Sequence, residues 1–130
     1  MITERILGLG TDLVEISRIE DSLTKFGDRF LGKIFFPEEI AYAQSQSRPA
    51  VHLAARFAAK EAAAKAFGTG IGESLPWLGL EVGRHAHGEP FIRFHSSAVD
   101  LARTRGITRA LVSLSHTQTL ASATVVLIGS

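Results

Sequence analysis

A group of charged side chains in an alanine-rich stretch is the first candidate for chemistry. Residues Val51 to Phe67 are predicted to form a helix, because strong helix formers dominate the stretch and Gly68 stands where a C-cap belongs. At about 100° per residue, Lys60 falls within the apolar stripe of this helix. A buried ammonium group without an anion is costly, so we expect a negative group to meet Lys60.

The other charges of this helix admit two interpretations. In the first, Lys60 snorkels to the surface, and Glu61 and Lys65 form an i,i+4 ion pair. In the second, Arg56 and the two lysines gather around a polyanion such as a pyrophosphate, and Glu61 supplies an oxygen ligand to the Mg²⁺ that neutralises it. Asp12 is a candidate second carboxylate, although taken alone its position favours a helix N-cap.

Three further motifs were weighed as binding sites. Gly8 and Gly10 begin a G-x-G, but Leu13 occupies the third glycine position, so a dinucleotide-binding turn is unsupported. The segment Gly68 to Gly72 follows a helix, which favours a C-cap and a loop over a phosphate cradle. The tripeptide Ser115-His116-Thr117 clusters hydrogen-bonding groups at a strand end, which suits a turn and a binding site equally.

The elements that position these residues follow from periodicity and turn residues. Ile6 to Gly10 is predicted to be a strand, followed by a turn at Thr11-Asp12 and a helix from Leu13 to Phe26. A short helix is predicted to start at Pro37. The remaining predicted elements are two hairpin strands, a helix and two C-terminal strands: Leu78 to Arg84, Phe91 to Phe94, Ser96 or Ser97 to Gly106, Ala110 to Ser115 and Leu120 to Ile128. This mixture predicts an α+β fold with a mainly antiparallel sheet packed against the long alanine-rich helix.

Composition bounds the classes of protein that remain. A chain of 130 residues with 45% hydrophobic and 21% charged residues predicts one globular domain over residues 1–130. A net charge of +1 gives no field that favours nucleic acid, and the absence of cysteine excludes disulfides, thiol catalysis and Cys-ligated zinc. No signal peptide and no apolar run of roughly 20 residues is found, so we expect a soluble, cytoplasmic protein without a membrane partner.

Taken together, the motifs resemble those of a known family. The residues that carry the resemblance are Gly10-Thr11-Asp12, Arg18, the run Arg56-Phe57-Ala58-Ala59-Lys60-Glu61-Ala62, the run Lys65-Ala66-Phe67-Gly68, and Ser113 to Thr117. They resemble the holo-acyl-carrier-protein synthases, the short-chain branch of the 4′-phosphopantetheinyl transferases. The pattern FxxKEAxxKAxG is its most specific element, and the resemblance extends from the first predicted strand to the last.

The resemblance implies Mg²⁺-dependent transfer of 4′-phosphopantetheine from coenzyme A to a serine of apo acyl carrier protein, in the service of fatty acid biosynthesis. Adenosine 3′,5′-bisphosphate is the second product. By similarity, Asp12 and Glu61 are the metal ligands, and Glu61 and Lys65 are catalytic. The residues assigned to coenzyme A are Arg56, Lys60, Lys65, Gly68, Ser115, His116 and Thr117. A homotrimer with active sites between protomers is also implied.

The resemblance does not identify the residue that accepts the serine proton or the surface that binds the carrier. Glu61 is the first candidate for the acceptor, and a water held by Glu39 or Asp12 is the second. Arg18 and Lys25 share a face of the first predicted helix and are candidates for docking the acidic carrier. The chain departs from many relatives before its second helix, where it has Phe36 in place of a small hydroxyl residue, so any role of that hydroxyl does not transfer.

The main alternative function is a non-catalytic module that binds coenzyme A or a nucleotide, and a third is an assembly protein with a structural helix. The pairing of Asp12 with Glu61 argues against the module, because cations alone suffice to hold phosphates. The assembly interpretation leaves Lys60 in the apolar stripe unexplained.

Overall fold

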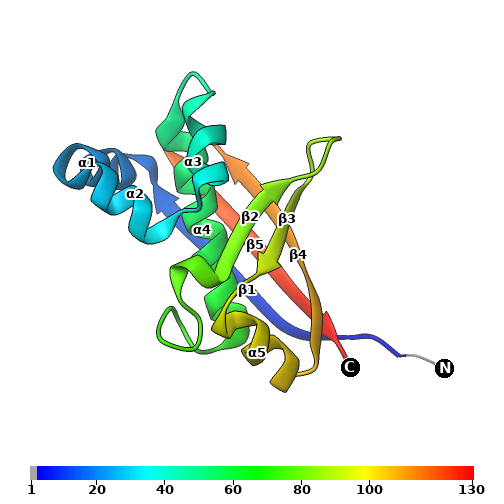
Figure 1. Ribbon diagram of the computed structural model, residues 1–130. Helices are drawn as coiled ribbons and strands as arrows, with labels where there is room; N and C mark the ends of the chain where they lie inside the picture. The colour runs from blue at the N-terminus through cyan, green and yellow to red at the C-terminus, as the bar shows by residue number, and fades with distance from the viewer. Residues whose placement is uncertain (1–2) are drawn as a thin grey trace.

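A long helix packs against one face of an antiparallel sheet in the computed structural model, which describes residues 3–130 (Figure 1). The elements in chain order are β1 (Arg5–Glu15), α1 (Ile16–Phe26), α2 (Asp28–Ile34), α3 (Pro37–Gln44), α4 (Pro49–Phe67), η1 (Trp77–Gly79), β2 (Leu80–Arg84), β3 (Pro90–Phe94), α5 (Ser97–Thr104), β4 (Ile107–His116) and β5 (Leu120–Gly129). One sheet has the strand order β1-β5-β4, and β2 and β3 form a separate two-stranded hairpin. Both sheets are antiparallel, so the predicted fold class is confirmed.

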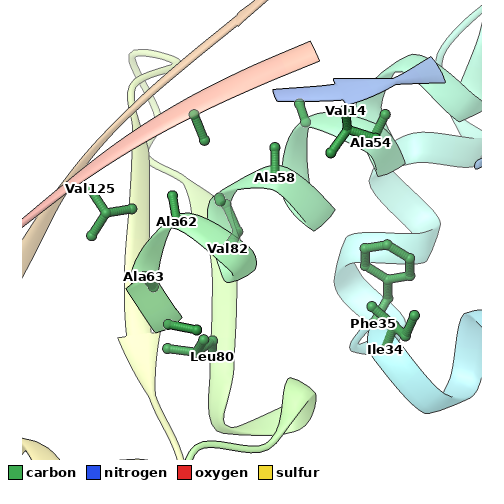
Figure 2. Packing of buried hydrophobic residues seen from close by; sticks show 14 of the residues in the cluster. Val14, Ile34, Phe35, Ala54, Ala58, Ala62, Ala63, Leu80, Val82 and Val125 are labelled. Carbon is green, nitrogen blue, oxygen red and sulfur yellow. The ribbon is translucent and has the colours of Figure 1, made fainter. Parts of the chain in front are cut away.

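Helix α4 forms the centre of the core. It begins at Pro49, two residues before the predicted start, and ends at the predicted C-cap Gly68, whose φ of 81° is left-handed. Figure 2 shows the alanines of α4 lying between side chains of the sheet, such as Val125, and side chains of β2, such as Val82. Because alanine is small, β1 and β5 approach the helix on one side while α3 and β2 approach it on the other.

The buried apolar residues of the helices and both sheets form one cluster around α4. None of the helices in the described part of the chain is long and apolar enough to cross a lipid bilayer.

Strand β1 is longer than predicted, and this changes the place of Asp12. The predicted turn at Thr11-Asp12 and the helix start at Leu13 are wrong, because pairing with β5 continues to Glu15. Side-chain exposure alternates as in a strand: Leu13 is 64% exposed and Val14 is 2% exposed. Helix α1 begins at Ile16, so Asp12 is a strand residue and the N-cap interpretation is wrong.

Helix α2 was not predicted. Leu31 and Ile34 are buried against the core, and this packing stabilises a helix that continues through Gly32. The predicted α3, β2–β3 hairpin, α5, β4 and β5 are confirmed, with ends that differ by a few residues.

The G-x-G of β1 serves helix packing. A Cβ atom on Gly10 would collide with the carbonyl oxygen of Ala62, and one on Gly8 would collide with that of Ala66. The backbone of β1 therefore lies directly against α4, at a distance that only glycine permits. This contact sets Asp12 beside the last turns of α4.

Candidate active site

Asp12 of β1 and Glu61 and Lys65 of α4 form what we call the carboxylate site. Lys65 Nζ donates hydrogen bonds to Asp12 Oδ1 at 2.9 Å and to the carbonyl oxygen of Thr11 at 3.1 Å. Lys65 thus pairs with Asp12 across the helix–strand contact, and the interpretation of Lys65 as the ion-pair partner of Glu61 is not supported. The Lys65 side chain is 54% exposed, so its ammonium group is open to a ligand.

The surroundings of Glu61 shift its pKa in opposing directions. Burial raises the pKa of Glu61, and the negative charge of Asp12 raises it further. Lys65 and Arg18 act in the opposite direction and lower this pKa. A carboxylate whose ionisation is disfavoured by burial and by a neighbouring carboxylate is the kind of group that a divalent cation stabilises.

The chemistry of the pair fits a hard cation such as Mg²⁺. Carboxylate oxygens are preferred Mg²⁺ ligands, and protein sites for this ion commonly supply one or two carboxylates and leave other positions to phosphate oxygens and water. Within residues 3–130, no set of three or more acidic, histidine or cysteine side chains is arranged to hold a metal. A cation held by Asp12 and Glu61 therefore needs further ligands from the substrate.

Lys60 lies apart from this site, in the core. Its side chain is 0% exposed, and Nζ donates to the Ile34 carbonyl oxygen at 2.6 Å, to Glu39 Oε1 at 2.9 Å and to the Trp77 carbonyl oxygen at 3.3 Å. Burial lowers the pKa of Lys60, and Glu39 opposes that effect. The expectation of a negative neighbour is confirmed, and the snorkelling interpretation is wrong. All three N–H donors are engaged inside the protein, so the geometry gives no support to the predicted contact between Lys60 and coenzyme A.

Glu39 is the buried partner of Lys60, and both of its oxygens are engaged. Besides Lys60, Oε1 accepts a hydrogen bond from the Phe36 backbone N–H at 2.7 Å, and Oε2 accepts one from the Val82 N–H at 3.0 Å. The residue is 2% exposed. Glu39 therefore ties α3, α4 and β2 together and has no free position for a catalytic water, contrary to the expectation for the proton acceptor.

A second group of functional residues lines a pocket where β4 ends, which we call the histidine pocket. It has a volume of about 390 Å³ and is lined by Ser47, Arg48, Val51, His52, His116, Thr117 and Gln118. Thr117 Oγ1 accepts hydrogen bonds from the backbone N–H groups of Thr119 and Leu120, which leaves its hydroxyl proton to donate. Ser115 lines a smaller cavity of about 120 Å³ beside it, also with His116 and Thr117. The structure thus brings the predicted tripeptide together as one surface.

Arg56 lies next to the histidine pocket and is 2% exposed. Its guanidinium carbon stands 4.4 Å from the centre of the Tyr42 ring, and Arg84 of β2 stands 5.2 Å from the same ring. Among residues 3–130, Arg56 Nε and Nη1 have no hydrogen-bond partner. Both arginines line a cavity of about 240 Å³. Buried guanidinium N–H groups without partners favour the binding of an anion.

His52 is the residue of this pocket that the sequence interpretation missed. Its ring is 5.6 Å from the Tyr42 ring and 6.1 Å from the His116 ring, both in edge-to-face geometry. The only signal in the sequence is its spacing, one helical turn before Arg56.

The two groups of residues lie on opposite sides of one chain. His52 and Glu61 are nine residues apart, which places them on opposite faces of α4 and about 14 Å apart along its axis. Asp12 lies on β1 and His116 on β4, and these strands are the two edges of the three-stranded sheet. Gly68 caps the end of α4 that carries Lys65.

Comparison with known proteins agrees with this arrangement. A sequence model of the 4′-phosphopantetheinyl transferase superfamily matches residues 8–119. The holo-[acyl-carrier-protein] synthase of Koribacter versatilis (strain Ellin345) is 50% identical over 122 residues, which make up 94% of this chain and 98% of that protein.

Solved structures extend the match to the fold. The crystal structure of the Neisseria meningitidis holo-[acyl-carrier-protein] synthase superposes with a TM-score of 0.88 at 37% identity, covering 95% of this chain and 98% of that one. The Helicobacter pylori synthase in complex with coenzyme A gives a TM-score of 0.82 at 30% identity, covering 92% of this chain and 98% of that one. With this identity over nearly the whole length, the chain belongs to the holo-[acyl-carrier-protein] synthases of the 4′-phosphopantetheinyl transferase superfamily.

Proposed function

We propose that this protein transfers 4′-phosphopantetheine from coenzyme A to a serine of apo acyl carrier protein in a Mg²⁺-dependent reaction. The observation that carries the proposal is the Asp12–Glu61 carboxylate pair with Lys65 beside it, in a chain of this family. The coenzyme A complex of the Helicobacter pylori relative supports coenzyme A as the donor. We also propose that the enzyme uses Mg²⁺ and that its reaction serves fatty acid biosynthesis.

The reaction joins the serine oxygen of the carrier to the phosphorus that bears the pantetheine. The bond from that phosphorus to the oxygen of the adenosine 5′-phosphate breaks, and adenosine 3′,5′-bisphosphate leaves with the bonding electrons. Mg²⁺ held by Asp12 and Glu61 supplies neutralisation of the diphosphate charge. Lys65 adds a positive charge at the same place and orients the phosphate through its N–H donors.

Glu61 is the proposed acceptor of the serine proton. Burial and Asp12 raise its pKa, which makes this carboxylate a better base than an exposed one. A bound cation lowers that basicity, and burial works against the lowering. Glu39 is excluded by its buried bonds to Lys60 and to two backbone N–H groups.

The nucleotide end of coenzyme A is assigned to the histidine pocket and the cavity beside it. His116 and Thr117 line the histidine pocket, and Ser115 lines the cavity of about 120 Å³ beside it. Arg56 lines the cavity of about 240 Å³. Gly68 remains assigned to the donor at the Lys65 end of α4, where its lack of a side chain leaves the approach open. Lys60 is left out of the proposed contacts.

A homotrimer whose active sites are shared between chains explains why the carboxylate site and the histidine pocket lie on opposite sides of one chain. Because they lie on opposite edges of the sheet, a cyclic assembly sets the carboxylate site of one copy beside the histidine pocket of the next. The face of the sheet turned away from α4 also carries an exposed apolar row in which Leu9 and Leu111 flank Val126. Leu9 is 66% exposed and Leu111 is 48% exposed, as expected for surfaces covered in an assembly.

The carrier is proposed to dock on α1. Arg18 and Lys25 are exposed on this helix, and Arg18 is close enough to Glu61 to lower its pKa. Cations beside the active site attract an acidic carrier helix and speed its association. We place the reaction in the cytoplasm.

The proposal is tested by weighing the carrier after reaction. The protein is incubated with coenzyme A, Mg²⁺ and an apo acyl carrier protein, and the carrier is analysed by intact mass spectrometry. We expect the mass to increase by one phosphopantetheine, and E61Q to abolish most of the increase. A non-catalytic coenzyme A-binding module would bind the donor and leave the carrier mass unchanged, which would overturn the proposal.

A further inference from the structure

His52 occupies a central place in the histidine pocket that the proposed reaction does not use. It is half-buried on the first turns of α4 and lines the pocket of about 390 Å³ together with His116 and Thr117. Its ring stands edge-on between two others, 5.6 Å from Tyr42 of α3 and 6.1 Å from His116 of β4. The Tyr42 ring in turn contacts the Arg56 guanidinium group.

Within one chain, the groups that flank His52 are neutral or cationic, and the nearest carboxylates, Glu38, Glu39 and Glu81, line the adjoining cavity of Arg56 and Arg84. The flanking groups are Tyr42 from α3, Arg48 and Arg56 from the N-terminal half of α4 and its cap, Arg84 from β2 and His116 from β4. Arg48 and Arg84 donate hydrogen bonds to the carbonyl oxygens of Gln118 and Gly88, which leaves their charges without a carboxylate partner. A positive charge on the His52 ring is disfavoured among these cations while the pocket holds no anion.

Burial and these charges act together on the ring. Burial lowers the pKa of His52, and Arg56, His116 and Arg84 lower it further. In the free protein the His52 ring is therefore protonated only at a pH below its ordinary pKa of 6.5. At neutral pH the ring is an uncharged imidazole. A phosphate group brings close to two negative charges, which offset much of the positive charge around the His52 ring.

We propose that His52 takes up a proton when a phosphate of the coenzyme A nucleotide end enters the histidine pocket, so that nucleotide affinity rises as the pH falls. The inference rests on the proposed function, because it assigns a phosphate monoester to this pocket. In the unprotonated state His52 holds the His116 ring in place through their edge-to-face contact. In the bound state it adds one cation to those that Arg48 and Arg56 supply.

The direct test is a titration of the histidine ring by NMR. Imidazole C–H resonances are followed against pH in the protein alone and in the protein saturated with adenosine 3′,5′-bisphosphate, without metal. The His52 resonance is assigned with the variant H52F. We expect saturation to raise the pKa of His52 by roughly 0.7 pH unit, which corresponds to a fivefold gain in affinity and to a partly exposed ion pair.

The outcomes separate this inference from the proposed function. If the nucleotide binds and the pKa of His52 stays constant or falls, the inference is overturned while the nucleotide site stands. If no histidine resonance of the pocket responds to the nucleotide at any concentration, the assignment of the nucleotide to this pocket is wrong, and the inference falls with it.

A matched pair of variants supplies the functional measurement. H52F keeps an aromatic ring between Tyr42 and His116 but has no titratable nitrogen. By calorimetry in buffers of different ionisation enthalpy, we expect wild type to take up more protons than H52F on binding the bisphosphate near pH 6. Wild-type affinity should rise roughly two- to threefold more than that of H52F between pH 8 and pH 6, because the full fivefold gain is reached only well below both pKa values of His52.

The control is H87F, which removes an exposed histidine at the turn between β2 and β3. This variant should behave like wild type in proton uptake and in the pH dependence of affinity. The titration of the ligand's own phosphates is common to all three proteins and cancels in the comparison. A purely structural role of His52 would lower the affinity of H52F equally at both pH values, and that result would contradict the inference.

Discussion

Glu61 is the side chain whose charge costs the fold most in the carboxylate site. Its pKa is raised above the ordinary 4.5 by burial and by Asp12, so between about 4.5 and the raised value the folded chain binds more protons than the unfolded chain. The contribution of Glu61 to stability is therefore fully present below 4.5 and is lost as the pH rises through that window. A bound divalent cation reverses this loss at neutral pH, because it stabilises the ionised form.

The loss of the Glu61 contribution to stability as the pH rises leads to a prediction for the variant E61Q. At pH 7.5 we expect millimolar Mg²⁺ to raise the unfolding temperature of wild type, by about 2 to 4 °C, and to leave that of E61Q unchanged. The wild-type gain should shrink toward pH 5 as the carboxylate takes up its proton. Scanning fluorimetry measures both effects, with E38Q, a change at an exposed acid of α3, as the control. An equal Mg²⁺ gain in E61Q would remove Glu61 from the metal site.

The Lys60–Glu39 pair lies in the core, and we expect it to act on stability. Both side chains are buried, and the pair holds together α4, the start of α3 and β2 through hydrogen bonds of 2.9 Å and 3.0 Å. Removing one partner leaves an uncompensated charge in the core, whereas removing both leaves none. The apolar stripe of α4 indicated a buried ammonium group but not its partner, which lies 21 residues away in sequence.

We therefore predict that K60M is strongly destabilised. The loss should be about 3 to 5 kcal/mol, because the Glu39 carboxylate remains in the core without its cation. The double variant K60M/E39Q should recover part of the loss, since glutamine is neutral and its one oxygen still accepts the hydrogen bond of either the Phe36 or the Val82 N–H group. Denaturant unfolding at one fixed protein concentration measures both. A K60M protein as stable as wild type, with weakened coenzyme A binding, would restore Lys60 to the donor site.

At the scale of elements, the contact between β1 and α4 positions the carboxylate site. Gly10 has the Ala62 carbonyl of α4 where a side chain would lie, and two residues later the strand presents Asp12 to Glu61 and Lys65. Backbone atoms cannot move aside as a flexible side chain can. The separation of strand and helix is therefore set by the absence of a Cβ atom at this position.

We predict that G10A separates the strand from the helix. The variant should lose about 1 to 3 kcal/mol of stability through overpacking, and its Mg²⁺-dependent gain in unfolding temperature should shrink because Asp12 moves away from Glu61. The matched control is G32A in α2, where nothing lies within 4 Å of the added methyl group. That change should be neutral or slightly stabilising, as alanine is the better helix former. Equal effects of the two changes would show that the G-x-G has no packing role.

The local sequence pattern predicted most of the helices and strands. It failed where pairing between residues distant in the sequence determines the structure. The helical propensity of α4 and the turn residues of the β2–β3 hairpin are local signals, and both elements were found. The stretch from Leu13 to Glu15 fits both a helical and an alternating pattern, and only its pairing with β5 makes it a strand. The same reason explains His52, whose ring partners come from α3 and β4.

Helix α1 carries the prediction for the carrier. Arg18→Glu should raise the KM for acyl carrier protein roughly tenfold, mainly by slowing association, and should flatten its dependence on salt. Binding of adenosine 3′,5′-bisphosphate should change little, because Arg18 acts at the carboxylate site and does not line the histidine pocket. The control is R103E on α5, an arginine that is 73% exposed and pairs with Asp100. Equal losses for carrier and nucleotide would move Arg18 into the nucleotide site.

At the scale of the whole molecule, the separation of the two groups of residues constrains the assembly. The carboxylate site belongs to the β1 edge of the sheet and the histidine pocket to the β4 edge. In the proposed trimer, each interface brings the β1 edge of one copy to the β4 edge of the next. An active site that needs both groups then takes Glu61 from one chain and His116 from its neighbour.

This arrangement makes a quantitative prediction for mixtures of inactive variants. E61Q and H116A should each lose most activity as pure proteins, while a one-to-one mixture unfolded and refolded together should recover about a quarter of wild-type activity in a trimer. The reason is that about three quarters of the refolded trimers contain both chains, and each of these has one interface of three where Glu61 meets His116. Mixing without unfolding is the control and should recover little. If both groups of a site belonged to one chain, no mixture would recover activity, and the two edges would have to be bridged within a single copy.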